Sequence, residues 1–283
     1  MASNTPLSSS PTSVSFLAYD TVCEENCHDD VNGKPVYNDN SLSDGPITLS
    51  EFIEALPPIL RLQRENGRKS LHERMKQDAL RGTKDDPVNV LFSRLDLSSM
   101  GWEKYALFDS MKKYTRNLIA TDDETFTLLL LCWNPNKESP IHDHPCDGCW
   151  LRVCQGKVQE TRYEINKDTD KMDVTSDEVY EDDAPAFIND SMGYVRWIQL
   201  FLLVRIHFFV LNANNSIATR YHKVGNPSTS TPAVTLHLYC PPFKECKIWL
   251  DPSHASRPSN AFMCNHSEYG VKPTCEMFEV NMI

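Results

Sequence analysis

Residues 139–156 read SPIHDHPCDGCWLRVCQG. His142 and His144 are separated by one residue, so on a β-strand, where side chains alternate between faces, both imidazoles would point to the same side. The Pro-Cys-Asp-Gly segment that follows should turn the chain, after which Cys149 begins an apolar run and Gly156 indicates the next hairpin turn. The pattern predicts two nitrogen ligands for one metal ion; the alternative is two ordinary, partly buried histidines near a turn.

The composition is that of a globular protein. The 283 residues are enough for one large or two small domains, and with 40% hydrophobic and 10% aromatic residues they can form a core. The 39 acidic and 28 basic residues give a net charge of -11, which would repel phosphate backbones and anionic membranes. Neither nucleic acid nor a membrane is expected as a partner. Ten scattered cysteines, without a secretory signal pattern at the start, indicate free thiols in a reducing compartment, so we expect a cytoplasmic protein.

The N-terminal part divides into two regions. Residues 1–45 are rich in Ser, Thr, Pro, Asn and Asp and have no apolar period, so a disordered extension is expected before a domain of residues 46–283. Helical patterns follow, with Thr48 as a candidate N-cap and Pro57-Pro58 as a stop or kink. Two more helical segments are predicted from SLHERMKQDALRG (70–82) and from SSMGWEKYALFDSM (98–111), the latter with Trp102, Tyr105 and Phe108 as core anchors.

From Tyr114 the patterns are those of short strands. The runs are aliphatic or β-branched and are separated by Pro, Asn, Asp or Gly: FTLLLLCW (126–133), CWLRVCQG (149–156), KVQETRYEI (157–165) and PAVTLHLYC (232–240). Many strands without intervening helices favour a sandwich or barrel. Residues 195–220 do not fit this pattern, because their apolar stretch at 197–211 is much more hydrophobic than its surroundings. The stretch is shorter than the about 20 residues that a spanning helix needs and is interrupted by Gln199, Arg205 and His207, so no transmembrane helix is predicted. We interpret them as an atypical insertion.

Three more histidines could complete a metal site with the first two: His207, His222 and His237. Alternation in the run 232–240 puts Thr235, His237 and Tyr239 on one face and the aliphatic residues on the other. Because the aliphatic face should pack, the polar face should line a cavity. There His237 would ligate a metal or hydrogen-bond a ligand, or else be an ordinary buried histidine.

An arginine near the start of the β-rich region is a candidate for substrate binding. Arg116 follows Tyr114 by two residues, so the two side chains would share a strand face. Its guanidinium could hold a carboxylate through two parallel hydrogen bonds. The alternative is a surface cation.

Together these motifs resemble a known family. The order HxH, four residues, Cys, six residues, Gly resembles the first metal motif of cupin barrels, with Cys149 where most cupins have a glutamate ligand. That substitution resembles cysteine dioxygenase. Further segments resemble the same family in the same order, between Pro46 and Gly270: YTRNL (114–118), SPIHDH (139–144), PAFINDSMG (185–193), YHKVGN (221–226) and PAVTLHLYCPPF (232–243).

The resemblance implies a fold and a set of site residues. The fold would be mainly β, a cupin-type barrel (double-stranded β-helix or jelly roll) preceded by N-terminal helices, in a monomer. The implied roles are Fe(II) ligation by His142, His144 and His222, substrate carboxylate binding by Arg116 beside Tyr114, a thioether crosslink between Cys149 and Tyr239, and a hydrogen bond from His237 to that tyrosine. Ser139 and Thr235 would occupy adjoining positions.

The implied activity is the conversion of L-cysteine and O2 to cysteine sulfinic acid, a step of cysteine catabolism towards taurine and sulfate. Three neutral imidazoles would leave Fe(II) its full charge, which favours an anionic thiolate. Both oxygen atoms would pass to sulfur. Two alternatives are a dioxygenase for another small thiol, such as 3-mercaptopropionate, and a metal-binding cupin without turnover.

Two features depart from the family or invite another interpretation. In relatives the segment resembling DSMG leads almost at once to the ligand histidine, whereas here residues 195–220 intervene, so translated intron sequence is one hypothesis. His207 lies inside this insertion and is rejected as a ligand. Cys146 and Cys149 form a CxxC pair, but no second pair with zinc spacing follows.

Overall fold

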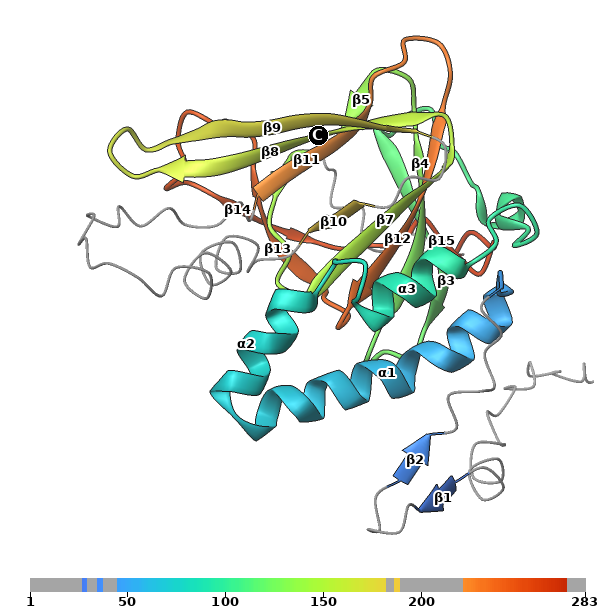
Figure 1. Cartoon of the computed structure of the whole chain (residues 1–283). Coiled ribbons are helices and arrows are strands. Elements are labelled where there is room, and N and C mark those ends of the chain that lie inside the picture. Colours follow the sequence, from blue (N-terminus) through green and yellow to red (C-terminus); the bar gives the residue numbers. More distant parts are fainter. Residues whose placement is uncertain (1–26, 30–34, 38–44, 182–185, 189–220, 274–283) are drawn as a thin grey trace, which may run out of the picture. The chain divides into compact units, whose positions relative to one another are not determined.

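The computed structural model describes residues 27–29, 35–37, 45–181, 186–188 and 221–273. The chain divides into two compact units, residues 1–45 and 46–283. In the first unit, β1 (Cys27–Asp29) pairs antiparallel with β2 (Pro35–Tyr37), inside the stretch that was expected to be disordered. The other elements belong to the second unit (Figure 1). The insertion at 195–220 lies outside the described residues.

The second unit begins with helices. They are α1 (Leu49–Lys69), α2 (Leu71–Leu80), α3 (Pro87–Arg94) and the short 3-10 helix η1 (Trp102–Tyr105). Thr48 caps α1 as predicted, because its hydroxyl accepts from the Glu51 amide while the Glu51 carboxylate accepts from the Thr48 amide. None of the described helices is both long enough and apolar enough to cross a membrane.

Two helix predictions differ from the structure. Of the stop or kink predicted at Pro57-Pro58, the stop is wrong, because α1 continues to Lys69. Phe52, Leu56 and Leu60 are all buried. Burying three such side chains contributes about 4.5–9 kcal/mol, which offsets the about 6 kcal/mol that two interior prolines cost.

The segment 98–111 forms only the short η1 rather than a full helix. Trp102 and Tyr105 pack against the core, but Phe108 is 43% exposed and is not a core anchor. The physical reason lies on the next strand, where Thr115 and Asn117 donate hydrogen bonds to the Leu107 carbonyl (2.5 and 3.4 Å). These bonds hold the chain extended.

Two sheets follow. The first sheet has the order β10 (Ala186–Ile188), β7 (Gly148–Gln155), β12 (Ala233–Cys240), β4 (Thr127–Trp133), β3 (Tyr114–Thr121) and β15 (Ser267–Glu268). The second sheet has the order β14 (Ser259–Phe262), β13 (Glu245–Trp249), β6 (Ile141–His142), β11 (Tyr221–Asn226), β8 (Lys157–Asn166) and β9 (Lys171–Glu181), with β5 (Lys137–Glu138) also on β11. All named strand pairs are antiparallel except β15 with β3.

The connections define the fold class. Strands β6, β7 and β8 pass from the second sheet to the first and back, and β11, β12 and β13 do the same. Within the sheets β7 pairs with β12 and β8 with β11. This alternation is the double-stranded β-helix of jelly rolls and cupins, so the prediction of a mainly β, cupin-type fold after N-terminal helices is confirmed. The turn predicted at Gly156 is also present, with φ 75°.

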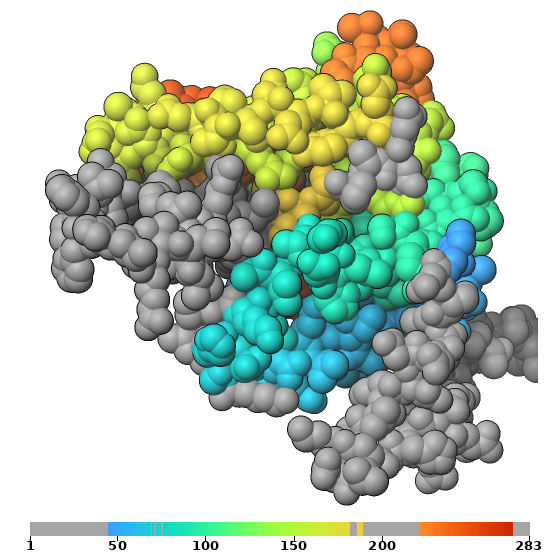
Figure 2. Space-filling view, in the orientation of Figure 1, coloured from blue at the N-terminus to red at the C-terminus, as the bar shows by residue number. Residues whose placement is uncertain are grey.

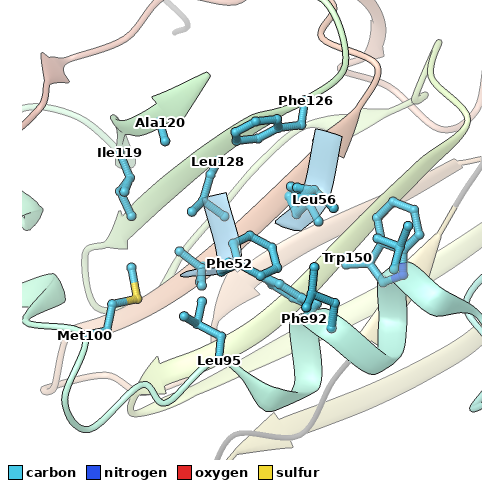
Figure 3. Close-up of a cluster of buried hydrophobic side chains, with 14 of the residues drawn as sticks. Phe52, Leu56, Phe92, Leu95, Met100, Ile119, Ala120, Phe126, Leu128 and Trp150 are labelled. Atoms are coloured by element: carbon cyan, nitrogen blue, oxygen red, sulfur yellow. The ribbon is translucent and has the colours of Figure 1, made fainter. Parts of the chain in front are cut away.

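The first sheet is covered on both faces. Its outer face packs on α1 and α3, where Phe52, Leu56 and Phe92 meet Leu128 of β4 and Trp150 of β7 (Figure 3). Its inner face forms a second apolar cluster with residues of β8 and β11. The space-filling view shows the helices and the β8–β9 hairpin at the surface of this unit (Figure 2). The central strand β12 is buried along its whole length.

Candidate active site

Three histidines converge on the inner side of the second sheet. His142 on β6 and His222 on β11 are directly opposed in an antiparallel pair. β6 ends at His142, so His144 is brought in by the following loop rather than by the strand alternation expected for the HxH pair. The three ring centroids lie 4.7–4.9 Å apart. One ligand atom of each residue lies within 4.8 Å of the others, and no other such group occurs within the described part of the chain.

The cluster suits a divalent metal ion. Burial lowers the pKa of His142 to about 4 and lowers the pKa values of His144 and His222 well below their usual value, so all three imidazoles are neutral at pH 7. Nδ1 of His142 lies 3.0 Å from the Pro140 carbonyl and Nδ1 of His222 lies 2.5 Å from Oε1 of Glu160. Both rings therefore keep Nε2 for a metal, the state in which histidine is a ligand.

Cys149 and Tyr239 are neighbours beside the cluster. They are directly opposed residues on β7 and β12 and both are buried, so their Cβ atoms are about 4.5–5.5 Å apart. The Tyr239 ring lies 6.0 Å from the His144 ring between centroids. Burial raises the pKa of the Cys149 thiol and that of the Tyr239 hydroxyl well above their usual values. Both groups keep their protons at neutral pH.

A chain of hydrogen bonds reaches Tyr239 from the core. Trp133 Nε1 donates to the Thr235 hydroxyl (2.8 Å), Thr235 Oγ1 lies 2.8 Å from His237 Nε2, and His237 Nδ1 lies 3.3 Å from the Tyr239 hydroxyl. Among the described residues, His237 Nε2 is the one acceptor for the Thr235 proton, so we infer that Nδ1 carries the ring proton and donates to Tyr239. His237 therefore forms a hydrogen bond with Tyr239 and is not part of the histidine cluster.

Arg116 and Tyr114 lie on the inner face of β3. The Tyr114 ring stacks on Trp133, with centroids 4.5 Å apart, and the Arg116 guanidinium lies 5.5 Å from the centre of the Tyr239 ring. Arg116 Nε is buried and has no hydrogen-bond partner among the described residues. A buried guanidinium donor without a partner suits a ligand carboxylate.

These residues border a small cleft. It is lined by Tyr114, Arg116, Pro140, His142, Tyr239, Phe243, Cys246, Ile248 and Met263. Arg116, His142 and Tyr239 all line the cleft, so one small ligand can contact all three.

The remaining predicted positions have structural contacts. Ser139 does not line the cleft; its hydroxyl accepts from the Val224 amide (3.1 Å), and its own amide donates to the Val224 carbonyl (2.8 Å). These bonds hold the segment before His142 against β11. Cys146 lies in the turn, with its sulfur 3.4 Å from the Gly148 carbonyl. His207 lies outside the described residues.

Sequence reasoning missed Glu160, Trp133 and Cys246. Glu160 touches His222, Trp133 holds the hydrogen-bond chain in place, and Cys246 lines the cleft. A signal for Glu160 was available in KVQETRYEI, where it lies two residues after the core residue Val158 and so shares its strand face. An acidic residue at an interior position of a strand needs a partner.

Comparison with known proteins agrees with this geometry. The family described as cysteine dioxygenase type I matches residues 68–200 and 209–251. The chain belongs to the cysteine dioxygenase type I family. The match leaves out residues 201–208, which lie inside the atypical insertion.

Curated relatives of the same family cover most of the chain. The chain is 30% identical to cysteine dioxygenase type 1 of Bos taurus over 188 residues, which is 66% of this chain and 79% of the relative. It is 29% identical to cysteine dioxygenase type 1 of Danio rerio over 211 residues, 74% of this chain and 89% of the relative.

Solved structures with some likeness include a double-stranded β-helix protein from Klebsiella pneumoniae, with a TM-score of 0.31 and 12% identity over 56% of this chain and 86% of that one. A second is an RmlC-like cupin from Shewanella frigidimarina, also with a TM-score of 0.31 and 12% identity, over 51% of this chain and 89% of that one.

Proposed function

We propose that this protein is a non-haem iron dioxygenase that converts L-cysteine and O2 to cysteine sulfinic acid. The observation that carries the proposal is the cleft in which Arg116 and Tyr239 face a cluster of three neutral histidines. Membership of the cysteine dioxygenase type I family supports the same reaction.

His142, His144 and His222 would hold the iron. When bound, Fe(II) would supply the redox chemistry of O2 and a positive charge that favours the substrate thiolate. Three neutral imidazoles fit this task because they add no negative charge to compete with the thiolate. The protein's own residues then have to bind, orient and shield the substrate.

Arg116 would bind the substrate carboxylate, using donors that include its buried Nε. Tyr114 would hold Arg116 in place from the same strand face, since its ring is fixed by stacking on Trp133. Phe243 borders the cleft and packs edge-on against Tyr239, with ring centroids 5.2 Å apart. This apolar wall would keep bulk water from the reacting sulfur.

The Tyr239 hydroxyl would donate a hydrogen bond towards the substrate. It keeps its proton at neutral pH because burial raises its pKa. Because His237 donates to the same oxygen, the tyrosine proton is left to point elsewhere. Cys149 on β7 would modify the ring by forming a thioether with Tyr239, the residue opposite it on β12.

Two other functions are tested alongside this one. 3-Mercaptopropionate would meet Arg116 in the same way but lacks the amine of cysteine. The second is a metal-binding cupin without turnover. It is included because the atypical segment 195–220 ends at the residue before β11, the strand that carries His222.

We place the reaction in the cytoplasm, consistent with the seven free cysteines of the described residues.

The test is oxygen uptake by the iron-loaded full-length chain, with the product identified by mass spectrometry. L-cysteine should consume one O2 for each sulfinic acid formed, and cysteamine, which lacks the carboxylate, should be a poor substrate. Arg116→Met should raise KM for L-cysteine by about 10-fold or more, since charged hydrogen bonds contribute about 1.5–3 kcal/mol. Arg257→Met, at an exposed arginine outside the cleft, is the matched control.

Each alternative has its own outcome in this experiment. Faster turnover of 3-mercaptopropionate than of L-cysteine would change the substrate. Metal binding without oxygen uptake would support the cupin without turnover, and uptake that appears only after deletion of residues 195–220 would assign the loss to that segment.

A further inference from the structure

A buried carboxylate lies directly behind one of the three clustered histidines. Glu160 on β8 is 4% exposed, and its Oε1 accepts a hydrogen bond from Nδ1 of His222 at 2.5 Å. β8 pairs with β11 along this stretch, which brings the acid and the histidine together from neighbouring strands. No step proposed above uses this acid.

The other oxygen of Glu160 is held by two donors. Arg162 donates to Oε2 from Nε (3.0 Å) and from Nη2 (2.9 Å). The Tyr180 hydroxyl lies 3.1 Å from the same oxygen and shares its one proton between Glu160 and Glu178. The guanidinium supplies the counter-charge that a buried carboxylate requires. Because Oε2 is occupied, Oε1 is directed at the imidazole.

This contact fixes the histidine. With its Nδ1 proton hydrogen-bonded to Glu160, His222 has its lone pair on Nε2, on the side of the ring that faces away from the acid. A carboxylate that accepts from a ligand imidazole also makes the imidazole a stronger donor to a metal.

The arrangement differs between the histidines. Nδ1 of His142 lies 3.0 Å from the Pro140 carbonyl, its hydrogen-bond partner among the described residues. A carboxylate accepts a stronger hydrogen bond than a neutral carbonyl does. The second sheet therefore places a negative charge behind His222 and a neutral group behind His142.

We propose that Glu160 is a positioning residue for the metal site, which holds His222 in its ligating tautomer and strengthens it as a ligand. Arg162 and Tyr180 position Glu160 in turn. The proposal rests on the proposed function in that it requires a divalent metal ion at the three histidines.

The competing explanation is a purely structural ion pair between Glu160 and Arg162. The chain offers a control, because Glu178 on β9 is the direct cross-strand neighbour of Glu160 and its Oε2 accepts from the same Tyr180 hydroxyl at 2.9 Å. Glu178 is exposed. A role confined to structure would change stability without changing the bound metal.

The experiment measures Co(II) binding by the full-length, metal-free chain. Affinity comes from competition with a chromophoric chelator, and the visible absorption of bound Co(II) reports its coordination. Glu160→Gln should weaken Co(II) binding about 10- to 100-fold and alter the absorption bands. Glu178→Gln should leave both unchanged.

A second variant covers the possibility that Glu160→Gln does not fold. Tyr180→Phe removes one donor to Oε2 but leaves the carboxylate, so it should give a smaller loss of affinity with the same direction of spectral change. Wild-type affinity and spectrum in folded Glu160→Gln, or in Tyr180→Phe where the first variant is unfolded, would overturn the inference alone. A wild-type chain that binds no Co(II) would overturn the proposed function as well.

Discussion

At the scale of single residues, strand β12 divides its side chains between stability and chemistry. Val234, Leu236 and Leu238 pack into the cluster beneath α1 and α3. The residues between them face the other sheet, where His237 and Tyr239 form the end of the hydrogen-bond chain. Because successive side chains on a strand point to opposite faces, a shift of one residue would exchange the two sets. The buried aliphatic face therefore fixes where the tyrosine points.

The pairing of Cys149 with Tyr239 predicts a crosslink. A thioether between the cysteine sulfur and a ring carbon forms with the loss of two hydrogen atoms, so it needs an oxidant, which O2 supplies during turnover. Incubation with iron, L-cysteine and air should convert part of the wild-type protein to a second band on a denaturing gel. Cys149→Ala should show one band and still bind iron, because the three histidines are untouched.

Cys146→Ala is the matched control, since this thiol lies in the turn before β7. It should leave the second band in place. A second band that persists in Cys149→Ala, or that disappears in Cys146→Ala, would show that the pairing is different.

At the scale of elements, the sequence was informative wherever a local pattern controls the structure. Alternation located β12 and its two faces. Residue preferences located the turn at Gly156 and the helix cap at Thr48. The errors came from contacts distant in sequence. Burial of three α1 side chains offsets the cost of the proline pair, and hydrogen bonds from β3 keep Leu107 out of a helix.

The site shows the same division. The HxH motif was recognisable, but its second histidine reaches the cluster through a loop after β6 that strand alternation does not describe. The link from Glu160 to the site was missed because His222 is 62 residues away, although Arg162, which balances its charge, is only two residues away. Periodicity indicates which face a residue takes and not which strand will lie opposite.

One contact between elements predicts a large effect on stability. Arg152 on β7 points to the helices, and its Nη1 donates to the carbonyls of Phe92 and Leu95 at the C-terminal end of α3, both at 2.6 Å. Replacing it with methionine would leave two carbonyls without this donor in a buried setting. Arg152→Met should lower the free energy of unfolding by about 3 kcal/mol, measured by urea denaturation.

Arg64 on α1 is the comparison for this loss. It bonds Glu124 at 3.4 Å, but the Glu124 side chain is 64% exposed, so Arg64→Met should cost less than about 1 kcal/mol. Similar losses in the two variants would mean that Arg152 does not cap α3. Iron stoichiometry should be preserved in both, because neither side chain faces the histidines.

At the scale of the whole molecule, the described residues of the site all belong to one unit. The division at residue 45 leaves both sheets, the three α-helices and the cleft in residues 46–283. The N-terminal unit contributes a two-stranded sheet of its own. A two-stranded sheet is marginally stable in isolation, whereas the larger unit has clusters of buried side chains on both faces of its first sheet. Folding and metal binding should therefore be properties of the larger unit.

Removal of residues 1–45 tests this division. The shortened chain should keep the free energy of unfolding, the iron stoichiometry and the KM for L-cysteine of the full-length chain, and it should sediment as a monomer, as the full-length chain should. Since Thr48 begins α1 with its own capping box, the cut leaves the first helix start intact. A loss of about 2 kcal/mol or more, compared by urea denaturation at equal concentration, would mean that the N-terminal unit packs against the larger one and stabilises it.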